Sequence, residues 1–270
     1  MIECIELKKL AEDIRKEIIR MAAYCDGDAH WGGALSCVDM LAALYGKYLN
    51  IAHQQREECV KDKFILSKGQ SAIALYATLS ACGIWEKEYL KNFQQDGSVL
   101  AELAIMDEER GIECSGGSLG LGLGLGVGMA IFGMRKKQKY KVVVLVGDGE
   151  CNEGSVWEAI MLAGQHRLEN LQLIVDLNGL QSDGKTEDIV SNQNLAERIA
   201  SFNWQVSEID GNDIEKCYAT LCEEHKGRPH AIIMRTIKGK GISFMENNNE
   251  WHHRILNKNW LEEARREVGL

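Results

Sequence analysis

The 270-residue sequence has no excess of positive charge, no long apolar run and only one proline. Its formal net charge is −9, so the composition does not indicate electrostatic binding to nucleic acid or to an acidic membrane surface. No apolar run approaches the ~20 residues of a membrane-spanning helix. The start carries acids rather than the basic and apolar regions of a secretory signal. We expect a cytoplasmic protein with small-molecule substrates and without nucleic-acid or membrane partners.

The sequence also lacks paired cysteines. Nine cysteines are scattered along the chain and none forms a CxxC pair. This spacing argues against a cysteine-based zinc site. An odd count in a chain of this length favours reduced thiols that act mostly as small core residues.

What the chain does contain is an alternation of apolar strands and helices. With 45% hydrophobic and 26% charged residues, it has enough apolar surface for a sizeable core. We predict strands over 64–69, 141–146, 171–176, 204–210 and 230–236, and helices over 3–24, 34–49, 70–82, 86–95, 154–168, 193–201, 212–226 and 258–268. The strands are apolar through their middles, which is typical of a parallel sheet flanked by helices on both faces. We find no linker and no repeat, so we expect one α/β domain over 1–270, with N-terminal helices within 3–50 and a C-terminal helix at 258–268.

Two predicted strands end in polar motifs that fit one another. Asp148 lies between two glycines after the first of these strands, and Asn178-Gly179 follows the next one, 30 positions on. A strand–helix–strand unit has about this length, so both side chains can meet at one sheet edge, where doubly wound sheets bind ligands. A carboxylate and an amide oxygen suit Mg²⁺ or Ca²⁺, and the Gly149 amide could approach a phosphate. Either motif alone is typical of a plain turn; the pair favours a site.

Glycines recur at every second position from Gly120 to Gly128. No frame of this run fits the G-x-G-x-x-G dinucleotide fingerprint. We predict instead that Gly124 to Gly128 lie in a helix packed closely against a neighbour, at some cost in helix propensity, and that Gly117 to Gly122 contribute to a site.

In order along the chain, AHWGGALSCVDMLAALY, KDKFILSKG, GGSLGLGLGLGVGMA, VLVGDGECNEGSVWEA, LIVDLNGLQSDG and TIKGKGISFMENNNEWH resemble the N-terminal half of a transketolase. The resemblance covers nearly all of 10–257 and is closest to transketolases made as two separate subunits. It implies the pyrophosphate-binding domain of the thiamine diphosphate fold. It also implies a C-terminal, pyrimidine-binding partner subunit that supplies the acid activating the cofactor, and the implied assembly is a heterotetramer.

The same resemblance assigns roles to individual residues. Asp148, Asn178 and the Leu180 carbonyl would hold Mg²⁺. The cofactor contacts would come from the residues Gly117, Leu119, Gly149, Glu150, Asn178, Leu180, Lys238 and His252. Catalytic positions would be His30, Gln70 and Glu153, with Glu153 near the cofactor or the partner. The implied reaction transfers a two-carbon or acyl unit from a ketose or keto-acid donor to an aldehyde-type acceptor.

The chain departs from the family pattern at several positions. Transketolases carry histidine where this chain has Gln70, Gly-His-Pro where it has Glu102-Leu103-Ala104, histidine where it has Gln165, and usually glutamine where it has Leu121. Histidine can donate to a developing oxyanion and move protons near neutral pH, whereas Gln70 can only donate a hydrogen bond and Leu103 can do neither. Two interpretations remain open: an active enzyme with a non-standard substrate, or an inactive subunit that binds cofactor and partner as a regulator or scaffold.

Overall fold

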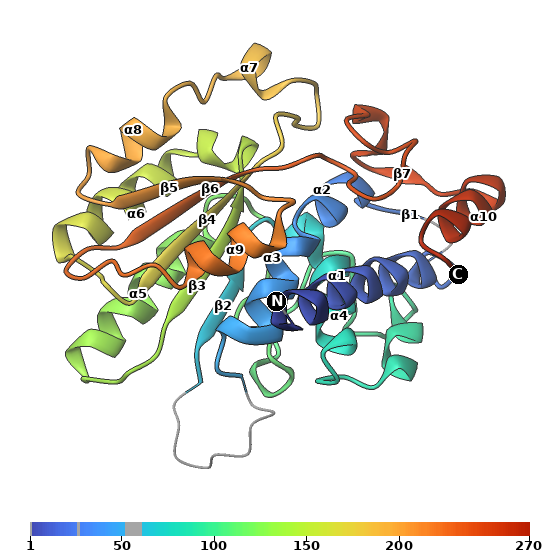
Figure 1. Ribbon diagram of the computed structural model, residues 1–270, viewed down its shortest axis with the longest axis horizontal. Coiled ribbons are helices and arrows are strands. Elements are labelled where there is room, and N and C mark those ends of the chain that lie inside the picture. Colours follow the sequence, from blue (N-terminus) through green and yellow to red (C-terminus); the bar gives the residue numbers. More distant parts are fainter. Residues whose placement is uncertain (1, 26–27, 52–60) are drawn as a thin grey trace.

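The computed structural model describes residues 2–25, 28–51 and 61–270. Its centre is a five-stranded sheet with the order β2-β3-β4-β6-β5 and every neighbouring pair parallel (Figure 1). The strands are β2 (Lys63–Leu66), β3 (Val142–Gly147), β4 (Leu171–Leu177), β5 (Gln205–Asp210) and β6 (His230–Arg235). The predicted parallel α/β sheet is confirmed, and β3, β4, β5 and β6 lie within one or two residues of their predicted bounds.

Successive residues of one strand pack into two different apolar clusters. Val143 and Leu145 of β3 pack into one apolar cluster, and Val142 and Val144 pack into the other. Side chains alternate across a strand, so a strand covered on both faces must be apolar throughout. This explains why KVVVLV shows no hydrophobic alternation.

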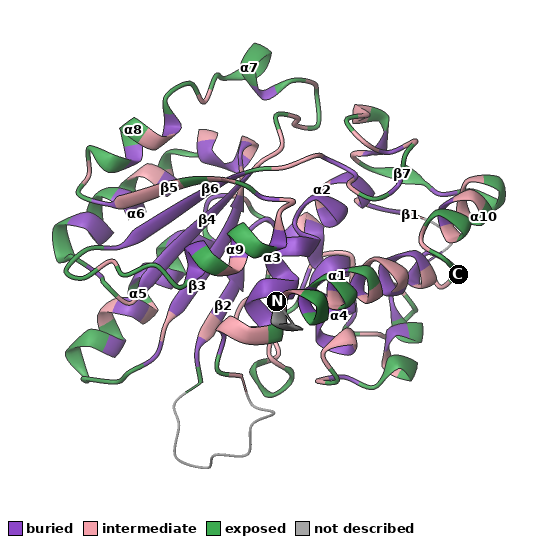
Figure 2. Ribbon diagram, viewed as in Figure 1, coloured by how far each residue is buried: buried purple, intermediate pink, exposed green. Residues whose placement is uncertain are grey.

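Helices cover both faces of the sheet, as Figure 2 shows by the buried strands between partly exposed helices. The first cluster contains residues of α1 (Ile2–Met21), α2 (Trp31–Ser36), α3 (Val38–Ala43), α4 (Ala72–Ala81), α9 (Ile214–Leu221) and α10 (Lys258–Glu267). The second contains residues of α5 (Gly122–Arg135), α6 (Gly154–His166) and α8 (Leu195–Ala200). One short helix, α7 (Thr186–Ile189), follows β4 and was not predicted.

Two predicted helices differ in the structure. The helix expected over 34–49 is divided into α2, α3 and a π-turn at Leu44–Tyr48, with the break at Cys37. The segment expected as a helix over 86–95 is a 3₁₀ helix, Lys87–Asn92. A two-stranded antiparallel sheet, β1 (Asp28–Ala29) with β7 (Arg254–Ile255), was also not predicted, because strands this short carry no periodic signal.

The helix predicted for the glycine run is confirmed, because Gly124, Gly126 and Gly128 lie in α5, but within the described part of the chain the close packing is found at Gly126 and not at Gly124 or Gly128. A Cβ on Gly126 would lie 2.5 Å from Val144 Cγ2, so this glycine allows α5 to approach β3. A Cβ on Gly124 or Gly128 would meet no atom within 4 Å. The helical repeat turns these two glycines to the outer face of α5.

No helix in the described part of the chain is long and apolar enough to cross a membrane. Nor does a disulfide join any of the described cysteines.

A buried ion pair ties the carboxyl ends of three strands together. Lys68, just after β2, pairs with the fully buried carboxylate of Asp176 in β4. The Ser36 hydroxyl donates to Asp176 Oδ2 at 2.6 Å, and the Thr236 hydroxyl, just after β6, donates to Asp176 Oδ1. The Lys68 ammonium also donates to the Gly33 carbonyl at 2.8 Å. Burial alone lowers the pKa of Lys68, but the Asp176 carboxylate outweighs it and the net pKa is raised.

We expect Lys68→Met to lower the free energy of unfolding by about 3–5 kcal/mol, because it leaves the Asp176 carboxylate buried without its cation. Urea denaturation followed by circular dichroism measures this change. The matched control is Lys8→Met, which breaks the exposed Lys8–Glu215 pair and should change stability little. Equal midpoints for the two variants would contradict a structural role of the buried pair.

Candidate functional site

A cavity of about 550 Å³ opens at the carboxyl ends of β3 and β4. Most of the residues singled out in the sequence line it: His30, Gln70, Leu119, Asp148, Gly149, Glu150, Glu153, Asn178, Leu180, Lys238 and His252. These residues come from segments up to about 220 positions apart, brought together because parallel strands end at one sheet edge. The structure therefore places these positions around one cavity.

Asp148 lies at the base of this cavity and is held rigidly. Its Oδ2 accepts hydrogen bonds from the Gly179 amide at 2.7 Å and the Thr186 hydroxyl at 3.0 Å, and its Oδ1 accepts from the Gly149 amide at 2.8 Å. Burial, followed by the charge of Asp176, raises the pKa of Asp148, and the hydrogen bonds act against this. A buried carboxylate with a raised pKa gains from a nearby cation. Asp148 is both a turn residue and an available anion.

The loop after β4 offers further oxygen atoms to the cavity. Asn178 and Leu180 both line it, and Asn178 Oδ1 accepts a hydrogen bond from the Leu180 amide at 3.1 Å. The Leu180 carbonyl accepts from the Lys238 ammonium at 3.1 Å. Carboxylate, amide and carbonyl oxygens are the donors that hard cations prefer.

Buried Lys238 and half-buried His252 form a basic pair that lies beside the β4 loop. Lys238 Nζ lies 2.8 Å from His252 Nδ1 and 3.2 Å from Asn249 Oδ1. Burial lowers the pKa of Lys238 to about 8. Burial and then the Lys238 charge lower the pKa of His252 to about 3. At neutral pH the pair therefore holds a cationic lysine beside a neutral histidine.

Glu150 is turned into the protein and secures the backbone around the cavity. Its Oε1 accepts from the Gly120 amide at 2.9 Å and from the Ser67 hydroxyl, and its Oε2 accepts from the Gly147 amide at 3.2 Å. Burial raises the pKa of this carboxyl. Both oxygens thus hold the ends of β2 and β3 and the glycine run in place. Its contacts are those of a positioning residue, and its role as a cofactor ligand stays a prediction.

Two buried polar atoms beside the cavity have no hydrogen-bond partner among the described residues: Gln181 Nε2 and Asn152 Oδ1. An unpaired buried polar atom is costly, so the site suits a polar ligand. Gln181 also passes over Gly149, where an added Cβ would lie 2.9 Å from Gln181 Cγ. Sequence reasoning missed Gln181 and Asn152 because nothing in their local pattern separates them from ordinary loop residues.

His30 stands at the rim of the cavity beside Glu102. His30 Nδ1 lies 2.6 Å from Glu102 Oε1. Burial lowers the pKa of His30, and the Glu102 carboxylate partly counters this effect. Glu102 was noted in the sequence only as a departure from the family pattern.

Four of the positions singled out in the sequence differ in their burial and in whether they line the cavity. Gln70 is half-buried in the 3₁₀ turn before α4 and lines the cavity, whereas Glu153 is exposed at its edge. Gly117 is not among the lining residues; a Cβ on it would lie 3.1 Å from Leu103 Cδ1, so these two residues pack together. Gln165 is exposed near the end of α6, outside the cavity lining. The departure at Gln165 therefore changes the outer surface of α6.

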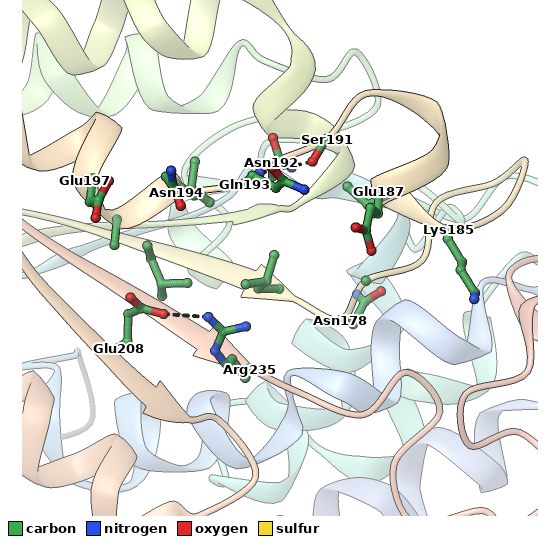
Figure 3. A pocket seen from close by; sticks show the side chains of 16 residues that line it. Asn178, Lys185, Glu187, Ser191, Asn192, Gln193, Asn194, Glu197, Glu208 and Arg235 are labelled. Carbon is green, nitrogen blue, oxygen red and sulfur yellow. Dashed lines mark hydrogen bonds and ion pairs between the residues drawn. The ribbon is translucent and has the colours of Figure 1, made fainter.

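A second cavity, of about 530 Å³, lies on the other side of Asn178 (Figure 3). Figure 3 shows the Arg235–Glu208 ion pair, whose length is 2.8 Å, among the lining residues, together with Lys185 and Glu187 near Asn178. Asn178 and Gly179 are the residues of the β4 loop that line both this cavity's wall and the region next to Asp148. Most residues with a role predicted from the sequence line the first cavity rather than this one.

The fold and the first cavity define a thiamine diphosphate-binding domain. A family model described as the transketolase thiamine diphosphate binding domain matches residues 8–270, and the chain belongs to this family of transferases. The predicted resemblance to the N-terminal subunit of a split transketolase is confirmed.

The relatives agree with this assignment. The chain is 39% identical to one subunit of the apulose-4-phosphate transketolase of Phocaeicola vulgatus over 270 residues, 99% of this chain and 95% of the relative. It is 34% identical to a 6-deoxy-6-sulfo-D-fructose transketolase subunit of a Clostridium species, over 96% of this chain and 95% of the relative. It is also 33% identical to human transketolase, covering 97% of this chain but 42% of the relative.

A solved structure of Campylobacter jejuni transketolase superposes with a TM-score of 0.86 at 26% identity, over 100% of this chain and 43% of that one. The chain thus spans about two fifths of the solved transketolases that it matches.

We expect Lys238→Met to raise the pKa of His252 from about 3, because the lysine charge is the second cause of its depression after burial. The sign follows from like charges: removing a neighbouring cation makes protonation of the imidazole easier. A pH titration of the histidine ring protons by NMR measures the change. His230, at the start of β6, whose pKa is lowered by burial to about 4, is the internal control and should titrate unchanged. An unaltered His252 titration would contradict the coupling.

Proposed function

We propose that this chain is the cofactor-binding subunit of a Mg²⁺- and thiamine diphosphate-dependent transketolase, acting as one domain over 1–270. The single observation that carries the proposal is the convergence of the Asp148 carboxylate, the Asn178 amide and the Leu180 carbonyl on one cavity that also contains two lysine ammonium groups. Such a set of hard oxygen donors and cations fits a metal diphosphate. When bound, thiamine diphosphate supplies the nucleophilic carbon that cleaves and re-forms the C–C bond.

Asp148, Asn178 and Leu180 would hold the Mg²⁺ ion. The Leu180 carbonyl accepts from Lys238 Nζ, so metal binding would require this ammonium to release it. Lys238 Nζ, which also contacts Asn249 and His252, could then turn to a diphosphate oxygen, and the unpaired Gln181 amide lines the same cavity. The Gly149 amide donates to Asp148 Oδ1 in the structure and would have to exchange that bond to reach a phosphate. His252 is neutral at physiological pH and can donate or accept a hydrogen bond there.

The apolar and catalytic sides of the cavity come from other residues. Leu119 and Leu180 supply apolar surface for the rings of the cofactor. His30, held by Glu102, and Gln70 can donate hydrogen bonds to substrate oxygens. Glu153, at the exposed edge of the cavity, is placed to act toward the partner subunit.

The donor we propose is a ketose other than the usual ketose phosphates. Gln70 lines the cavity where family members carry histidine, so this wall lacks a proton-transferring group. The two relatives at 39% and 34% identity are named for apulose 4-phosphate and 6-deoxy-6-sulfo-D-fructose, and each of these ketoses carries an anionic group. The same chemistry, a ketose with an anionic end, is our proposed substrate class, with an aldehyde as acceptor.

An exposed apolar surface supports a partner subunit. Leu121, Leu125 and Phe132 project from the outer face of α5, between 48 and 57% exposed, and Met161 of the adjacent α6 is 54% exposed. Gly124 and Gly128 leave open space on the same face of α5, which would let another helix approach closely. Large exposed apolar surfaces in soluble proteins mark interaction sites. Relatives that are named as transketolase subunits support a partner subunit, which we propose to be a C-terminal, pyrimidine-binding subunit in a heterotetramer.

We expect Asp148→Ala to abolish Mg²⁺-dependent binding of thiamine diphosphate, because it removes the only carboxylate of the proposed metal set. Isothermal titration calorimetry with the cofactor and Mg²⁺, in the presence of the partner subunit, measures binding. The control is Asp213→Ala, which removes an exposed carboxylate at the start of α9. Unchanged affinity in Asp148→Ala would make Asp148 a turn residue only. Absence of binding by the unaltered complex would favour the scaffold interpretation.

We expect Leu125→Arg to prevent assembly with the partner subunit and to abolish turnover, because the interface would have to bury an unpaired charge. Size-exclusion chromatography and a ketose-cleavage assay measure the two effects. The control is Ile5→Arg, which alters an exposed apolar residue on α1, away from α5. Turnover by the chain without any partner would refute the proposal of a shared active site.

A further inference from the structure

A second group of metal-binding side chains lies at the rim of the cavity. In the antiparallel β1–β7 pair, Asp28 is opposite Ile255 and Ala29 is opposite Arg254. The next step along this register sets His30 opposite His253. Directly opposed residues of an antiparallel pair have Cβ atoms about 5 Å apart, and the two imidazole rings indeed lie with centroids 4.4 Å apart.

Glu102 completes the group from a different part of the chain. Its Oε1 lies 2.6 Å from His30 Nδ1 and 3.0 Å from His253 Nε2. One ligand atom from each of the three residues falls within 4.8 Å of the others. A fourth candidate ligand atom, Asp28 Oδ1, lies 3.5 Å from His253 Nε2. Among the described residues this is the one group of three histidine, cysteine or acidic side chains with such spacing.

We propose that His30, Glu102 and His253 form a binding site for a divalent transition metal ion of the Zn²⁺ class, separate from the Mg²⁺ site proposed at Asp148. Two imidazoles and one carboxylate are a ligand set of open zinc sites, which leave a fourth position for water or substrate. Imidazole favours transition metals over Mg²⁺, so the two sites differ in the ion they select.

The distances suit such an ion after a small adjustment. Tetrahedral zinc with bonds of about 2.0–2.2 Å sets its ligand atoms roughly 3.3 Å apart. The His253–Glu102 distance is close to this value, and the His30–Glu102 pair must separate by less than about 1 Å. Asp28, which is half-exposed, or a water molecule can take the fourth position.

This site would be coupled to the cavity through His30, which belongs to both. A bound metal ion would replace the hydrogen bond between His30 and Glu102 and hold the imidazole in one orientation. It would also bring a positive charge and an open coordination position to the mouth of the cavity, where the oxygen atoms of a ketose or an anionic substrate could bind. The metal site depends on the side-chain geometry and not on the proposed reaction.

The test is titration of the full-length chain, assembled with its partner subunit, with Zn²⁺ in the presence of excess Mg²⁺. Calorimetry should show one zinc equivalent per chain. Co²⁺ in place of Zn²⁺ should give visible absorption bands of a low-symmetry histidine and carboxylate site. We expect Glu102→Gln and His253→Ala each to weaken zinc binding by more than about tenfold, since loss of even a supporting group costs that much.

The matched control is His225→Ala. His225 and His230 also form a close histidine pair, with centroids 5.2 Å apart, but without the carboxylate geometry of the rim group. Zinc affinity should be unchanged in this variant. Absence of stoichiometric zinc binding by the unaltered protein would overturn the proposal, as would equal loss in all three variants. Thiamine diphosphate binding, measured on the same samples, should persist in Glu102→Gln and His253→Ala, so failure of the proposed cofactor would be seen separately.

Discussion

The ion pair between Lys68 and Asp176 is the constraint on which the rest of the site depends. It joins the ends of β2 and β4, and through Ser36 and Thr236 it reaches α2 and β6. Two charges can remain so deeply buried only if they are paired and fully hydrogen-bonded. Because these partners come from four elements, the pair holds the sheet edge in one arrangement. The same elements, together with the segment after β3, carry the cavity walls.

Charge is distributed unevenly around this edge. Asp148, Asp176 and Glu150 are buried acids, while Lys68 and Lys238 are buried bases. Glu150 is satisfied by two backbone amides and a hydroxyl, and Asp176 by Lys68. Asp148 is also satisfied by neutral donors, but burial and the nearby charge of Asp176 both raise its pKa, whereas at Glu150 burial raises the pKa and the charge of Lys68 lowers it. Because a second acid lies near it, Asp148 is the carboxylate that has most to gain from a metal cation, and Lys238 is the cation that has most to gain from an anion.

Much of the fold and of the candidate site could be predicted, because their sequence signals are local or depend only on the order of the strands. Asp148 and Asn178 follow consecutive apolar strands, and parallel strands end at one edge. The contacts of Lys68, Asp176, Gln181 and Glu102 could not be predicted, since they join segments from about 30 to over 150 residues apart. The close packing expected at Gly124 and Gly128 is not made within the described part of the chain, because a glycine pattern does not show which face of a helix is inward.

By itself, the sequence determined the alternation of strands and helices, the parallel sheet, the family and the residues that gather at the edge of the sheet. These follow from hydrophobic period, strand order and motif. Only the tertiary structure decided that Glu150 faces inward, that α5 presents an open apolar face, and that Glu102 meets His30 and His253. The physical reason is that hydrogen bonds, burial and cross-strand register depend on how distant segments are placed, and no local pattern encodes that placement.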